Sequence, residues 1–151
     1  MDVDREGADG YFVCQSKQLA SAGARVHARI GPDGGERQIS VLRNGTQLHA
    51  LDSICYHAGG PLTSGDIEDV NGRSCIVCPW HTYKVTLDTG EKLYRATEMN
   101  AAGKPVPVGW RSAGPRQRVH TVVERAGKVY VVLGTEPREL PSDPYALRPP
   151  R

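Results

Sequence analysis

Apolar and polar residues alternate along several short runs of the chain, a pattern typical of half-buried β-strands. The clearest local signal is Asn44-Gly45 between two alternating runs, because a tight hairpin turn needs positive φ. A convincing amphipathic helix is missing from the pattern, although residues 16–23 are compatible with one helical turn. The predicted strands cover residues 11–14, 26–30, 38–43, 46–51, 74–78, 84–88, 119–124 and 128–133.

Glycine and proline mark the segments that separate these strands. They predict two loops, at residues 55–65 and 78–84. Residues 91–118 show no clear period and contain several Gly and Pro residues, so we expect one long loop there. A structureless loop of that length is unusual in a compact domain, which indicates a functional segment or an insertion.

The two ends of the chain differ from its middle in composition. Residues 1–10 are polar and acidic and are expected to be disordered. Residues 137–151 hold five prolines, which predicts an extended or disordered tail. The remaining residues, 11–136, are predicted to form one all-β domain of the sandwich or barrel type.

Charge and cysteine content narrow the class of protein. A formal net charge of +2 implies no strong field, so we expect neither nucleic-acid nor membrane binding. No run approaches the ~18 apolar residues of a membrane span, and the N-terminus does not resemble a signal peptide. A cytoplasmic protein with reduced cysteines is therefore expected, and Cys14 and Cys75 are interpreted as core residues.

Two short motifs, Cys55-Tyr56-His57 and Cys78-Pro79-Trp80-His81, carry the candidate chemistry. Thiolate and imidazole together suit iron–sulfur, zinc or copper sites. A Cys₂His₂ zinc finger groups its cysteines and its histidines separately, whereas here each loop carries one of each. Two facing loops of this kind allow both cysteines to bind one iron and both histidines the other. A structural zinc site and two chance Cys/His pairs remain alternatives.

The spacing Cys-x-His, twenty residues, Cys-x-x-His resembles that of the Rieske iron–sulfur family. The flanking sequences agree with this resemblance, at residues 55–62 in the first loop and at residues 78–81 and 88–91 around the second. Residues 65–69 and 76–81 are especially similar to vertebrate members of the family.

This resemblance implies a Rieske-like β-sandwich or barrel base with a small cluster-binding subdomain. It also implies one [2Fe–2S] cluster, with Cys55 and Cys78 on the buried iron and His57 and His81 on the outer iron. The two imidazoles would then lie at the surface and form the exit for the electron.

The chain departs from the high-potential members of that family at positions that affect the reduction potential. Their extra disulfide would join the positions of Gly60 and Trp80, and their Ser and Tyr hydroxyl donors would stand at Tyr83 and Val85. Because such donors stabilise the added electron, their loss predicts a potential near the low end of the Rieske range, about −150 mV rather than about +300 mV.

The expected function is that of a monomeric one-electron carrier, not itself an enzyme, between a reductase and an acceptor such as an oxygenase. A dissociable Rieske subunit of an oxygenase or reductase complex, or a structural zinc or iron–sulfur sensor module, are the alternatives. A stand-alone oxygenase is disfavoured, because the spare histidines lie in predicted strands: His27, His49 and His120. A cationic group in the long loop is either a docking site for an acidic partner or a solvated surface: Lys104, Arg111, Arg116 and Arg118.

Overall fold

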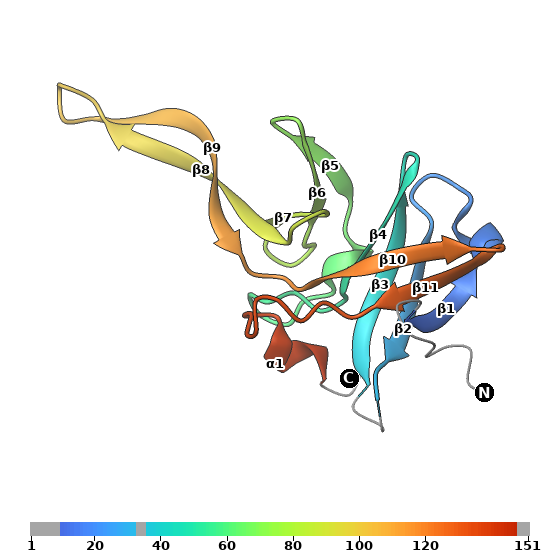
Figure 1. The fold of residues 1–151 in the computed structure, drawn as a ribbon. Coiled ribbons are helices and arrows are strands. Elements are labelled where there is room, and N and C mark those ends of the chain that lie inside the picture. The colour runs from blue at the N-terminus through green and yellow to red at the C-terminus, as the bar shows by residue number, and fades with distance from the viewer. Residues whose placement is uncertain (1–9, 33–35, 148–151) are drawn as a thin grey trace.

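The protein is almost entirely β-structure, which confirms the predicted fold class (Figure 1). The computed structural model describes residues 10–32 and 36–147. The disorder expected for residues 1–10 therefore lies, except for Gly10, outside the described residues. Helical structure in the described part is confined to two short 3-10 segments, η3 (Ser16–Leu19) and η4 (Leu62–Ser64), and the four-residue helix α1 (Asp143–Ala146).

The larger sheet has six antiparallel strands and curls toward a barrel, because its two edge strands also contact each other. The predicted hairpin is present, but its turn residues are Gly45 and Thr46, since Asn44 pairs with Gln47. Gly45 has φ +61, the conformation that glycine adopts without steric cost. The strand order is β1 (Tyr11–Gln15), β11 (Lys128–Val132), β10 (Val119–Arg125), β4 (Gln47–Asp52), β3 (Arg37–Asn44) and β2 (Arg25–Ile30).

The smaller sheet has five strands in sequential antiparallel order. An apolar cluster that draws on both sheets includes Leu42 and Leu51 from β3 and β4, and Ile76 and Val85 from β6 and β7. Each such buried side chain contributes roughly 1.5–3 kcal/mol of transfer free energy. The strands are β5 (Ile67–Val70), β6 (Arg73–Val77), β7 (Lys84–Thr86), β8 (Glu91–Met99) and β9 (Pro105–Pro115).

The prediction of a long loop at residues 91–118 is wrong, because most of this segment forms the β8–β9 hairpin. Register shifts in β8 interrupt the alternation that would reveal a strand. The prolines of β9, which suggested a loop, are tolerated because β9 is an edge strand that pairs only with β8. The hairpin projects away from the rest of the molecule (Figure 1).

The prediction of an extended or disordered tail is wrong for the described residues 137–147, which include the helix α1. Helix α1 packs against the domain, and both Ser142 and Ala146 are fully buried. The side chains of Ser142 and Asp143 bind buried polar groups of the domain, which explains why a polar, proline-rich segment is held in place. Residues 148–151 lie outside the described part.

Candidate metal centre

The first motif lies in the loop that follows β4 and contains η4. The Cys55 amide donates to the Gly60 carbonyl at 2.8 Å, and the Gly59 amide donates to the Cys55 carbonyl at 3.1 Å. Gly59 has φ +77, and a Cβ at this position would lie 3.2 Å from the ring of Tyr145 in α1. The loop is thus closed by its own backbone and covered on one side by the C-terminal helix.

The second motif occupies the turn between β6 and β7. The Cys78 amide donates to the Tyr83 carbonyl at 2.9 Å, and the Thr82 amide donates to the Cys78 carbonyl at 2.8 Å. Thr82 adopts φ +57, a conformation that β-branched residues rarely take. This tight turn places His81 at an exposed tip while Cys78 stays in the core.

The structure brings the two cysteines of these motifs together as a buried pair. Cys55 and Cys78 are 1% and 2% exposed, and their thiols share a hydrogen bond. Burial raises the pKa of the Cys55 thiol, and the nearby Cys78 raises it further, while the amides of His57 and Ala58 donate to its sulfur and oppose the rise. A bound cation would offset the cost of ionising such a pair.

The two histidines form a second pair at the surface. The rings of His57 and His81 are both exposed, and their centroids lie 4.8 Å apart, edge to face. The Tyr83 ring stacks on His57 with centroids 4.0 Å apart and planes inclined by 19°. Within residues 10–32 and 36–147, no group of three or more His, Cys, Asp or Glu side chains converges closely enough to hold a single metal ion.

Gly60 and Trp80 connect the two loops. A Cβ at Gly60 would lie 2.9 Å from Cδ2 of Trp80 and 3.1 Å from the Cys78 sulfur. The indole therefore lies against a backbone position that admits no side chain, although the Trp80 side chain is 57% exposed. These are the two positions that a disulfide joins in the high-potential proteins of the predicted family.

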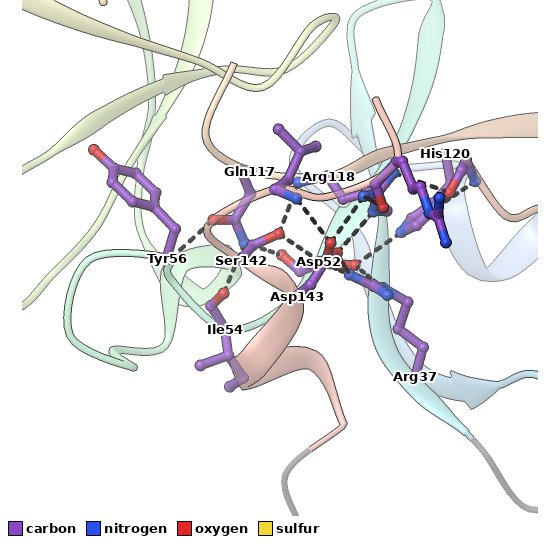
Figure 2. Close-up of polar contacts among 12 residues, drawn as sticks. Arg37, Asp52, Ile54, Tyr56, Gln117, Arg118, His120, Ser142 and Asp143 are labelled. Atoms are coloured by element: carbon purple, nitrogen blue, oxygen red, sulfur yellow. Dashed lines mark hydrogen bonds and ion pairs between the residues drawn. The ribbon is translucent and has the colours of Figure 1, made fainter. Parts of the chain in front are cut away.

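Gln117, which no sequence motif singles out, holds the backbone on both sides of Cys55 (Figure 2). Its fully buried side chain donates from Nε2 to the carbonyls of Asp52 at 3.0 Å and Ile54 at 2.7 Å. Its Oε1 accepts the amide of Tyr56 at 3.0 Å. The entry to the first loop is thus fixed by one residue more than sixty positions away.

A buried carboxylate, Asp52, lies at the base of this arrangement (Figure 2). Arg37 donates to both of its oxygens at 2.7 and 2.6 Å, His120 lies 2.9 Å away through Nε2, and the Ser142 hydroxyl donates at 2.7 Å. Burial alone would raise the pKa of Asp52, but the bonds from Arg37 and His120 outweigh burial and hold the pKa below its usual range.

Asp143 joins helix α1 to the same network. It accepts two hydrogen bonds from the buried Arg118 guanidinium, at 2.8 and 2.9 Å, and one from Arg37. Burial opposes the charge on Asp143, yet the bonds from Arg118, the Leu140 amide and Arg37 lower its pKa well below the usual range. Asp143 thereby ties the C-terminal segment to β3 and to the residue that precedes β10.

Comparison with known proteins finds relatives that are Rieske-type proteins or ferredoxins. The family model for soluble Rieske-type ferredoxins matches residues 18–136. A human Rieske domain-containing protein is 48% identical over 111 residues, which cover 74% of this chain and 69% of that protein. The ferredoxin subunit of anthranilate 1,2-dioxygenase from Burkholderia cepacia is 34% identical over 56 residues, 37% of this chain and 48% of the subunit.

Solved structures confirm the fold. The ferredoxin of Sphingomonas yanoikuyae B1 superposes with a TM-score of 0.54 at 18% identity, over 82% of this chain and 97% of that one.

The described residues contain no helix that is long and apolar enough to cross a lipid bilayer.

Proposed function

This chain belongs to the soluble Rieske-type ferredoxin family, and from that premise we propose that it carries single electrons between redox proteins. The proposed ligands of one [2Fe–2S] cluster are Cys55 and Cys78 on one iron and His57 and His81 on the other. The observation that supports this proposal is the pairing itself, a buried Cys–Cys pair and an exposed His–His pair on two adjacent loops.

The residues present fit such a group. Two thiolates and two imidazoles are the donor set that a Rieske centre requires, and the amides of His57 and Ala58 point at the Cys55 sulfur, where they would stabilise its charge. When bound, the cluster supplies a site for one added electron. The apolar core around Cys55 and Cys78 keeps water from the sulfur ligands, and the exposed imidazoles provide the shortest path to a partner.

The proposed partners are a reductase that supplies the electron and an acceptor such as an oxygenase. The relative from Burkholderia cepacia, named as the ferredoxin subunit of a dioxygenase, supports an oxygenase as acceptor. The protein itself would catalyse no reaction. We propose a monomeric, cytoplasmic carrier, because the cytoplasm keeps thiol ligands reduced. Co-purification of a large catalytic chain would instead identify a dissociable oxygenase or reductase subunit.

The decisive measurement is the optical and low-temperature electron paramagnetic resonance spectrum of the purified protein before and after dithionite. We expect a red-brown protein whose reduced form gives a rhombic signal of low average g. A colourless protein that contains zinc and gives no signal after anaerobic reconstitution would contradict the electron-carrier proposal.

Serine substitutions at Cys78, a proposed ligand, and at Cys75, which is not one, provide a matched test of the ligand assignment. Cys78→Ser should abolish cluster assembly, because the remaining three ligands leave one iron incomplete. Cys75→Ser is the control, because Cys75 is fully buried in β6 yet lies outside both motifs. A coloured Cys78→Ser protein, or a colour lost equally in both variants, would contradict the assignment.

A further inference from the structure

The two loops that carry the exposed histidines, residues 53–65 and 78–84, include no Asp or Glu. The tip face, as we name the surface around these histidines, consists of five residues that are exposed or partly exposed: His57, Trp80, His81, Tyr83 and Lys92.

Lys92 lies over the aromatic ring that stacks on His57. Its ammonium lies 4.6 Å from the centroid of the Tyr83 ring, which in turn stacks on His57. A cation over an aromatic face is favourable, and Lys92 remains partly exposed to solvent. The described residues offer Lys92 no carboxylate within ion-pair distance, whereas the neighbouring Lys84 lies 3.8 Å from Glu68.

A second positive charge, that of Arg116, flanks the first loop. The Arg116 guanidinium donates to the carbonyl of Pro115 and, in the described part of the chain, pairs with no carboxylate. The next residue, Gln117, accepts the Tyr56 amide at 3.0 Å, which places residue 116 beside the first loop.

The other cations considered in the sequence analysis do not join this surface. Arg111 pairs with Glu98 at 2.7 Å, and the buried Arg118 pairs with Asp143. Lys104 lies beside the turn at the far end of the β8–β9 hairpin, on the order of 20 Å of strand from Lys92. The four-residue cationic group predicted from sequence is therefore divided, and only Arg116 contributes at the loops.

We propose that the redox partner presents a carboxylate-rich protein surface that docks on the tip face. This inference rests on the proposed function and adds to it the charge of the partner. Complementary charge steers two proteins into encounter and raises the association rate at low ionic strength. The exposed indole of Trp80, next to His81 in the second loop, provides an apolar anchor, as aromatic residues do at interface centres.

Small oxidants of opposite charge test the sign of the field at this face. The protein is reduced with dithionite, freed of excess reductant and mixed with hexacyanoferrate(III) or with tris(phenanthroline)cobalt(III). One electron passes from each reduced protein to one metal complex, which becomes iron(II) or cobalt(II). The rate constant with the anionic oxidant should fall about tenfold as ionic strength rises from about 0.01 M to about 1 M, because screening removes the attraction. The rate constant with the cationic oxidant should rise or stay constant.

Charge-reversal variants locate the field. Lys92→Glu combined with Arg116→Glu should lower the low-salt rate constant with hexacyanoferrate(III) about tenfold and leave the high-salt value within twofold. Lys104→Glu reverses one charge at the hairpin turn, the same change as Lys92→Glu alone, and should alter neither value by more than twofold. The midpoint potential of each variant is measured alongside, so that a change in driving force is not mistaken for steering.

Competition with polymers addresses the class of partner. Poly-L-glutamate should slow oxidation of the wild-type protein by hexacyanoferrate(III) and should have little effect on the double variant. A rate constant with the cationic oxidant that falls as ionic strength rises, an equal effect of Lys104→Glu, or inhibition by polylysine instead would overturn the proposal. A protein without the cluster would show no reduced signal at all, so failure of the proposed function is distinguishable from failure of this inference.

Discussion

At the scale of single residues, Gly60 leaves no room for even a methyl group between the two loops. Gly60→Ala would place Cβ 2.9 Å from the Trp80 ring, so we expect a loss of about 1–3 kcal/mol in unfolding free energy and poorer cluster retention. Denaturant unfolding and the iron content of the purified protein measure these effects. Removing the indole in Gly60→Ala/Trp80→Ala should recover part of the loss; a single variant as stable as wild type would refute the packing argument.

Asp143 makes a pH-dependent contribution to stability. Its pKa is lowered in the folded state, so the contribution is complete above the unfolded value of about 3.9 and is lost as the pH falls below it. Asp143→Asn leaves the buried Arg118 without its carboxylate, and we expect it to cost about 2 kcal/mol at neutral pH. Urea unfolding from pH 7 to pH 2 should show this difference shrinking below about pH 4.

The control for Asp143 is Asp66, an exposed residue between the first loop and β5. Asp66→Asn removes the same charge from a site without an ion pair in the described part of the chain, so unfolding free energy should change by less than about 0.5 kcal/mol. Equal effects of the two substitutions would mean that the network around Asp143 adds no specific stability.

At the scale of elements, the outer part of the β8–β9 hairpin is separable from the candidate metal centre. The last residues of β8, Thr97 to Met99, are exposed, whereas Leu93 near the start of the strand is buried. Replacing residues 97–108 with a short turn between Ala96 and Gly109, which pair across the strands, should leave the optical spectrum unchanged. Leu93→Ala should instead cost about 2–5 kcal/mol. If the protein with residues 97–108 replaced were colourless, the outer part of the β8–β9 hairpin would be shown to support the cluster loops.

At the scale of the whole molecule, the reduction potential reports on all groups around the cluster. By the family resemblance, Tyr83 and Val85 replace the hydroxyl donors of high-potential Rieske proteins, and Gly60 and Trp80 replace the cysteines of their disulfide. We therefore expect a midpoint near about −150 mV by potentiometric titration of the visible absorbance. A strongly positive midpoint would show that other donors stabilise the added electron.

The sequence by itself determined eight of the eleven strands in the described part, the β3–β4 hairpin and the four candidate ligands, but not β5, β8 or β9. These signals are local, because alternation, turn chemistry and motif spacing each depend on residues close together in the chain. The fold class followed from them and is confirmed. The role of Cys55, His57, Cys78 and His81 as ligands remains a prediction.

Only the tertiary structure decided what the β8–β9 segment and the C-terminal tail do. Proline marks a loop unless a strand lies at a sheet edge, and the edge position of β9 is a property of the assembled sheet. Asp52 and Ser142 are 90 positions apart, and neither residue type signals burial until folding places them side by side. The support of the first loop by Gln117 is invisible in the sequence for the same reason: a buried hydrogen bond depends on which groups folding brings together.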